Sequence, residues 1–260
     1  MRIIVSACLL ITLIGVPASA VVVFDLEITR IDEPGSVEQV RIVLDRGRLA
    51  LESGSNTVVY LADQETLIAI NHEGRRYTRI DRGTVEQISA RMNAAMKVLE
   101  AQLADMSPER RAMMEQMMGD RMPTPSVQTA PLDVRKTTET GTSGGYDWTK
   151  VQSFRDGELV MEHLVADWGS LGVEADVFSV FEDMAGFFTQ IASSLGGQVP
   201  VSNPFGEIGE LDGFPVVTRR YEDGQLESEV ILKSVDPNAS IPESTFEPPS
   251  DYREESPPRG

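Results

Sequence analysis

Residues 38–80 read EQVRIVLDRGRLALESGSNTVVYLADQETLIAINHEGRRYTRI, and apolar and polar residues alternate along much of this segment. Val40, Ile42 and Leu44 show the pattern at its start, with a period of two residues. That period is typical of a β-strand with one buried face. Asp45-Arg46-Gly47 interrupts the alternation and favours a tight turn, because glycine readily adopts a positive φ. The segment therefore predicts successive strands of a broad, curved antiparallel sheet.

Further strands are expected on both sides of this segment. The pairs Asp156-Gly157 and Asp223-Gly224 each separate two alternating stretches, which is typical of β-hairpins. The strands expected outside the opening segment cover residues 21–31, 134–140, 146–154, 159–167, 216–222 and 226–235.

Three helices are expected to pack on the sheet. The first begins near Thr84, which has capping-box spacing with Gln87, and an apolar stripe follows at steps of three and four. The second is expected over residues 107–118 and the third over residues 173–195. Strands and helices together predict an α+β fold, in which a curved antiparallel sheet forms an incomplete β-barrel closed by about three helices.

The first 20 residues predict the compartment. Arg2 precedes an apolar run and the small residues Ala18-Ser19-Ala20, a pattern typical of a secretory signal cleaved after Ala20. Cys8 is the single cysteine and lies inside this segment, so no disulfide is expected in the mature chain. A lipoprotein signal ending at Cys8 is disfavoured because almost no apolar stretch would precede it. We expect a periplasmic protein without a stable transmembrane anchor after cleavage.

The mature chain is expected to form one domain over residues 21–252. Within it, residues 84–122 are expected to be a methionine-rich helical insertion and residues 123–132 a proline-rich loop. Residues 253–260 are expected to be a disordered tail. The formal net charge is −18, which opposes binding to phosphate backbones, so nucleic acid is not an expected partner.

Five methionines gather in the expected helical insertion. Residues four apart share a helix face, so these thioethers could bind Cu(I). The alternatives are an adaptable lid or partner-binding surface, and plain packing. The residues concerned are Met113, Met114, Met117, Met118 and Met122.

The third expected helix carries more apolar side chains than one buried stripe requires. One interpretation is a core helix between two layers. Another is a helix that lines a lipid-sized cavity against the concave face of the sheet. The residues expected to line that cavity are Phe178, Phe181, Met184, Phe187, Phe188 and Ile191.

Catalytic chemistry is not expected. His72 and His163 are the only histidines, and neither lies near a nucleophile-elbow serine, a phosphate-binding loop or a cluster of metal ligands in the sequence. We therefore assign no catalytic residue, metal ligand or cofactor.

The C-terminal part of the chain carries a resemblance. Residues 213–217, 221–225 and 246–252, with the hairpin from Tyr146-Asp147-Trp148 to Asp167-Trp168, resemble the LolA/LppX-like periplasmic carriers. The similarity is greater to an uncharacterised exported bacterial branch with that general fold. It spans most of the mature chain, and its motifs are turns and anchors. It implies a strongly curved, incomplete barrel whose hydrophobic interior holds acyl chains in relatives.

Three alternative functions from different classes follow from these features. The first is a periplasmic carrier or sensor that binds a lipid or a lipoprotein acyl chain between the sheet and the helices. The second is a non-catalytic envelope protein-interaction module with a filled core. The third is a methionine-rich Cu(I)-binding protein.

Overall fold

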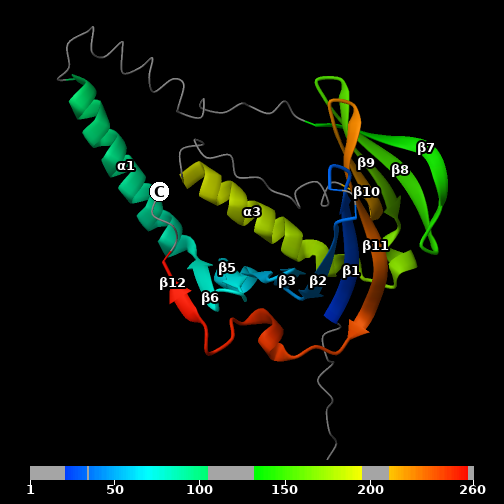
Figure 1. Cartoon of the computed structure of the whole chain (residues 1–260), viewed down its shortest axis with the longest axis horizontal. Coiled ribbons are helices and arrows are strands. Elements are labelled where there is room, and N and C mark those ends of the chain that lie inside the picture. Colours follow the sequence, from blue (N-terminus) through cyan, green and yellow to red (C-terminus); the bar gives the residue numbers. More distant parts are fainter. Residues whose placement is uncertain (1–20, 34, 105–131, 195–210, 257–260) are drawn as a thin grey trace, which may run out of the picture.

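The computed structural model describes residues 21–33, 35–104, 132–194 and 211–256. These residues form one twelve-stranded sheet in the order β12-β6-β5-β4-β3-β2-β1-β11-β10-β9-β8-β7. Neighbouring strands are antiparallel except β12 and β6, which are parallel. The sheet is curved and unclosed, and two long helices accompany it (Figure 1). The expectation of an open, barrel-like α+β fold is confirmed at this level.

The bounds of the elements follow from their hydrogen bonds. The strands are β1 Val21–Arg30, β2 Val37–Asp45, β3 Arg48–Ser53, β4 Asn56–Leu61, β5 Thr66–Asn71, β6 Arg76–Ile80, β7 Asp133–Ser143, β8 Tyr146–Arg155, β9 Glu158–Ala166, β10 Phe214–Glu222, β11 Gln225–Ala239 and β12 Arg253–Glu255. The helices are α1 Arg82–Ala104 and α3 Ser179–Ser194.

The strand pattern predicted both hairpins correctly. Asp156 and Gly157 have φ of 53° and 86°, and Asp223 and Gly224 have φ of 50° and 73°. Two successive positive φ values allow a two-residue turn to follow the twist of its strands.

Three expectations at the ends of elements were wrong. Helix α1 begins at Arg82, and its cap is Asp81, whose Oδ1 accepts a hydrogen bond from the Thr84 N–H at 2.7 Å, so Thr84 is inside the helix. Residues 173–178 are not part of the third helix, because a 3-10 turn over Ala175–Phe178 precedes α3. Arg253–Glu255 belongs to β12 rather than to a disordered tail, since β6 supplies backbone partners for it.

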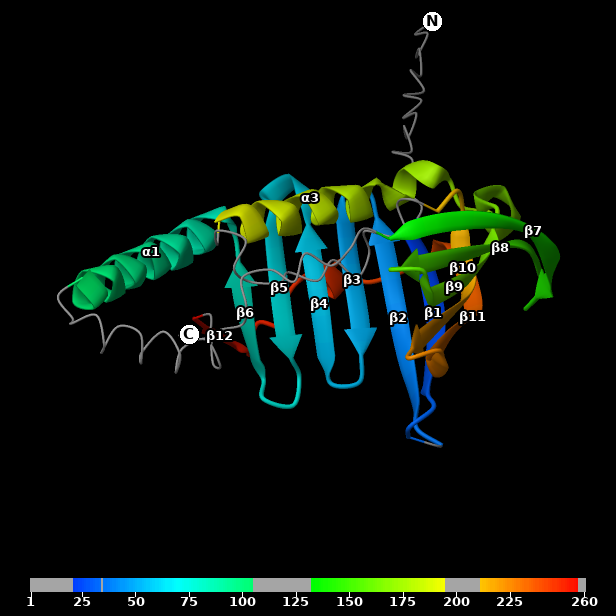
Figure 2. The same cartoon turned by 90° about the horizontal axis from the view of Figure 1, so that it is seen from above.

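The two faces of the β2–β6 part are covered by different segments. Helix α3 crosses one face, while the segment between β11 and β12 runs along the opposite side (Figure 1). Helix α1 starts beside β6 and extends beyond the sheet (Figure 2). The core accordingly has a larger cluster under α3 and a smaller one under the C-terminal segment.

Several expectations concern residues outside the described ranges. These are the signal peptide over residues 1–20, the second helix over 107–118 with the five methionines up to Met122, and the proline-rich loop up to residue 131. Within the described ranges, neither helix combines the length and the apolar character needed to cross a membrane.

Candidate functional site

A row of apolar side chains crosses the sheet beneath α3. The register pairs Leu44 with Leu49, Leu49 with Tyr60, Tyr60 with Leu67, and Leu67 with Ile80. Directly paired residues share a face, so the row runs from β2 to β6. The first three are at most 1% exposed, whereas Leu67 and Ile80 are half-buried. The cover over this face therefore becomes thinner toward β6.

The N-terminal end of α3 lies over a closely packed aromatic group. The ring centres of Trp168 and Phe178 are 3.9 Å apart, and those of Phe24 and Phe214 are 4.6 Å apart. Phe178 also lies 5.8 Å from Phe24. Such contacts add to the free energy gained by burying the rings. At this end the space between helix and sheet is occupied by the protein's own side chains.

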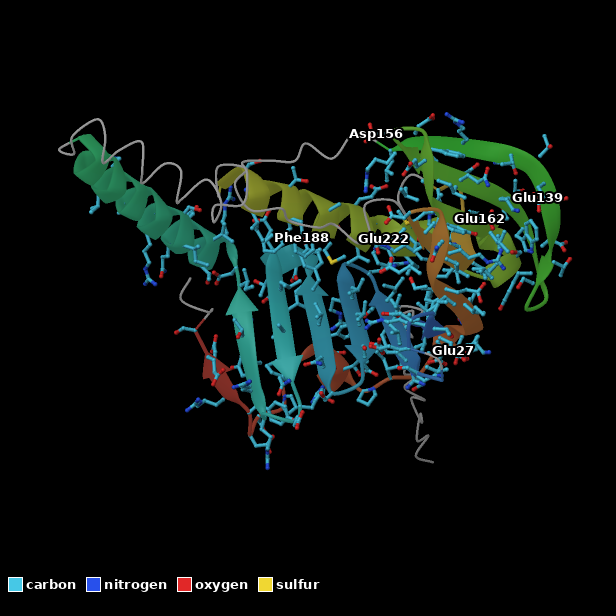
Figure 3. All side chains as sticks on the ribbon, turned by 45° about the horizontal axis from the view of Figure 1, so that its top comes forward. Glu27, Glu139, Asp156, Glu162, Phe188 and Glu222 are labelled. Atoms are coloured by element: carbon cyan, nitrogen blue, oxygen red, sulfur yellow. The ribbon has the colours of Figure 1, made fainter. Side chains whose placement is uncertain are left out.

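The six residues expected to line a cavity divide into two groups along the helix. Phe178, Phe181, Met184 and Phe187 are all at most 7% exposed and belong to the larger core cluster. Phe188 and Ile191, near the C-terminal end of α3, are half-buried at the margin of that cluster. The side chain of Phe188 is labelled in Figure 3, between α3 and the strands. Of the six residues, only Phe188 and Ile191 lie where the helix-facing surface of the sheet is incompletely covered.

A second apolar row lies beside the first on the same face. Ile42 pairs with Leu51, Leu51 with Val58, and Val58 with Ala69. Ile42 is 4% exposed, but Leu51 and Val58 are half-buried and Ala69 is exposed. We call the incompletely covered part of both rows, with the end of α3, the apolar shelf. It consists of Leu51, Val58, Leu67, Ala69, Ile80, Phe188 and Ile191.

Two polar residues border this shelf in the register: Thr78 pairs with Ala69 at the β6 end, and Tyr60 pairs with Leu67 at the covered end. Burial raises the pKa of Tyr60 to about 12, and the carboxylates of Asp183 and Glu65 add to the shift. The phenol is therefore neutral at physiological pH. No charge from the first row opposes an apolar ligand on the neighbouring shelf.

Charged side chains dominate a different part of the sheet. Glu162 on β9 is paired with Arg219 on β10, which is paired with Glu229 on β11. The Glu162 carboxylate lies 3.0 Å from Arg219 Nη1 and 3.4 Å from Lys150 Nζ. Burial raises the pKa of Glu162, but the two cations outweigh it and the net shift is downward. Glu162 lies in the β7–β11 part (Figure 3). This charged group therefore lies on other strands than the apolar shelf, whose residues come from β3–β6 and α3.

Each of the two histidines lies within hydrogen-bonding distance of neighbouring hydroxyls, His72 in the turn between β5 and β6 and His163 within β9. His72 lies between Thr57 Oγ1 at 2.9 Å and Tyr252 Oη at 3.1 Å. His163 is 4% exposed, and its Nδ1 lies 3.0 Å from Thr218 Oγ1. Neither residue belongs to the apolar shelf.

Sequence reasoning missed the strand residues of the shelf. Leu51 lies two residues after Leu49, and Val58 lies two residues before Tyr60, so the alternation placed each pair on one face of its own strand. It did not show which of them α3 covers, because the path of a helix across a sheet depends on contacts between distant segments. The signal that could have found them is the continuation of an apolar face beyond the width of one helix.

No protein-family model matches the chain, and no curated protein matches it. Among solved structures, an uncharacterised conserved protein from Thermus thermophilus is 9% identical, with 92% of this chain and 91% of that chain aligned and a TM-score of 0.46. The complex of Pseudomonas aeruginosa MucA and MucB contains a chain that is 11% identical, with 89% and 56% aligned and a TM-score of 0.39.

A structure of PNGF-II is 9% identical, with 92% of this chain and 31% of that chain aligned and a TM-score of 0.39. The chain thus spans just over half of the matched MucA/MucB chain and about a third of the PNGF-II chain. Similarity at these values concerns the course of the backbone and says nothing of ligand or partner.

Proposed function

We propose that this chain is an exported, non-catalytic protein of the bacterial envelope that holds a hydrophobic chain, such as the acyl chain of a lipid or lipoprotein, on the apolar shelf. One observation carries the proposal. Two adjacent rows of the helix-facing surface are apolar, but in the part of the chain that the structure describes α3 seals only the β2–β4 part of the first row. A contiguous apolar surface that is only partly covered often marks a binding site.

The shape of the shelf favours a linear ligand. Neighbouring strands lie ~4.8 Å apart, so the strip from β3 to β6 is about 14 Å long. Its half-buried side chains come from successive strands and form a line rather than a compact pocket. Burying apolar surface of both partners contributes about 25 cal/mol per Å². An extended acyl chain would gain most by lying along the strip beside α3.

A binding experiment with matched variants tests this function. We expect the mature protein to bind a fluorescent fatty acid, and Val58→Asp to weaken binding by about tenfold or more, because the charge would be desolvated by the ligand. Val58→Thr keeps the branched shape and should weaken binding less. Ile31→Asp is the control, since Ile31 is 49% exposed and lies outside the shelf. Failure of the wild-type protein to take up any fatty acid or phospholipid would contradict the proposal.

The packed aromatic group under α3 favours a second candidate function. If the half-buried shelf residues are the margin of a filled core, the chain acts as an envelope protein-interaction module, as the sequence also allowed. Native mass spectrometry of protein purified from a periplasmic fraction separates the two functions. A co-purifying acyl species supports the carrier or sensor, and a clean apo mass after lipid incubation supports the interaction module. Cu(I) binding by the methionines at 113–122 stays a prediction.

A further inference from the structure

The strand β7 lies at one end of the sheet order. Among the described residues its one neighbouring strand is β8. Every residue from Asp133 to Ser143 is exposed or half-buried. An edge strand presents unpaired backbone N–H and C=O groups, which can pair with a further strand. The pairing with β8 is regular over residues 133–136 and again over residues 140–143, and the register shifts between Lys136 and Thr140.

A groove of about 290 Å³ lies against β7 at residues 133–136, where the pairing with β8 is regular. Its apolar floor is a small cluster of Val151, Val165 and Leu211, which are 7%, 8% and 6% exposed. Val134 of β7 forms one wall and is itself 37% exposed. The remaining lining residues are Lys136, Thr149, Asp167 and Asp212.

The register shows how edge and groove would act together. Val134 pairs with Ser153 and Lys136 with Val151, so the side chains of Val134, Lys136 and Val151 share one face. A strand added beside β7 would place alternate side chains on that same face, over the groove. Backbone pairing would then supply affinity, and the groove would select an apolar side chain.

The irregularity after Lys136 limits the length of any added strand. Thr137 Oγ1 donates to the Lys150 carbonyl at 3.1 Å, and the Glu139 N–H donates back to Thr137 Oγ1 at 3.1 Å. The Thr137 hydroxyl thus donates to β8 where a backbone N–H of β7 would do so in a regular ladder. Bulges of this kind prevent open-ended growth of a sheet. The edge is therefore suited to a short segment along residues 133–136.

The charge of the protein indicates the partner's polarity. The formal net charge is −18, which attracts cationic partners over a distance set by the salt concentration. At the groove itself, the Asp212 side chain is 94% exposed and lies 3.9 Å from Lys136 Nζ. That ion pair is weak at such exposure, so Asp212 is free to turn to an incoming cation.

We infer that β7 and its groove bind a short extended segment of another protein, with an apolar side chain in the groove and basic residues beside it. The surface differs from the apolar shelf in its residues and in the chemistry it recognises. Binding of a peptide here is therefore independent of whether the shelf holds a lipid.

A synthetic peptide with valine at alternate positions and lysine between them is the probe. We expect the full mature chain to bind it in a salt-dependent manner, measured by fluorescence anisotropy. N-methylation of alternate backbone nitrogens should weaken binding by about tenfold or more, because the ladder hydrogen bonds are lost. A counterpart peptide with glutamate in place of lysine should bind no better than the N-methylated peptide.

Val134→Lys tests the groove, and Ile31→Lys is the matched control. Both replace an exposed apolar residue with the same charge, so both change the net charge equally and leave the core intact. We expect Val134→Lys to weaken peptide binding by about tenfold and Ile31→Lys by less than about twofold.

Three results would overturn the inference. One is undiminished binding of the N-methylated peptide, and another is an equal loss in both lysine variants, which would mean that net charge alone attracts the peptide. The third is a wild-type dimer in sedimentation that Val134→Lys converts to a monomer, because the edge would then pair with a second copy of this chain.

Discussion

The two edges of the sheet are finished in different ways. At the β6 edge the chain adds its own C-terminal strand β12. The segment that leads to β12 is anchored by Phe246, which packs beside Arg48 of β3 and is 2% exposed in the smaller core cluster. At the β7 edge the described chain adds no strand, and Val134 is left 37% exposed. We expect the first edge to contribute to stability and propose the second as the binding edge. The predictions below test this difference.

The largest effect is expected from Phe246→Ala. Removing a fully buried aromatic ring costs about 4 kcal/mol of unfolding free energy, from lost burial and the cavity left behind. The Arg48 guanidinium, which lies 4.5 Å from the ring centre, also loses its contact. Urea unfolding provides the measurement. Val134→Ala at the other edge is the control and should change stability by less than about 0.5 kcal/mol. Equal losses would show that the two edges do not differ.

A somewhat smaller effect is expected from acid, through His163 on β9. Burial lowers the pKa of His163 to about 4 from its ordinary 6.5, while the Glu162 carboxylate opposes the shift only partly. Between pH 4 and pH 6.5, His163 therefore binds a proton in the unfolded chain but stays neutral in the folded chain. The contribution of neutral His163 to the free energy of unfolding is complete above pH 6.5. It is lost as the pH falls to 4, by about 3 kcal/mol in total.

The measurement for His163 is urea unfolding at pH 7 and pH 4.5. His163→Gln should reduce the pH dependence of stability by most of that amount, whatever its effect at pH 7. His72→Gln is the control, because it lies near the β6 edge and leaves His163 in place. If the pH dependence is the same in wild type and His163→Gln, burial of His163 does not affect acid stability.

The two smallest effects are expected at the β6 edge, from Tyr252→Phe and then from Arg75→Ala. Tyr252→Phe removes the hydroxyl that lies 3.1 Å from His72 Nδ1, and one such hydrogen bond contributes about 1 kcal/mol. Arg75→Ala, which removes an exposed ion pair with Asp251, should cost less than about 0.5 kcal/mol. Thermal unfolding of both variants checks this order. A larger loss for Arg75→Ala would mean that the exposed ion pair holds the C-terminal segment more strongly than the Tyr252 hydrogen bond does.

Local patterns predicted most strands of this fold. The alternation over residues 38–80 depends only on the pleat of the strand, and the successive strands predicted there are β2 to β6. The Asp-Gly turns were equally readable, because positive φ is a property of a few residues. The apolar excess of the third expected helix likewise marked a segment that packs on the sheet.

The sequence by itself therefore determined the strands, the turns, the apolar faces and the acidic charge. The tertiary structure alone decided which strands are neighbours and which apolar residues are covered. It placed β1 between β2 and β11, took Arg253–Glu255 into the sheet beside β6, and left Leu51 and Val58 half-buried. The physical reason is that periodicity acts between residues close in the chain, whereas burial depends on distant segments, such as those of Val21 and Ala239, which pair although they are 218 residues apart.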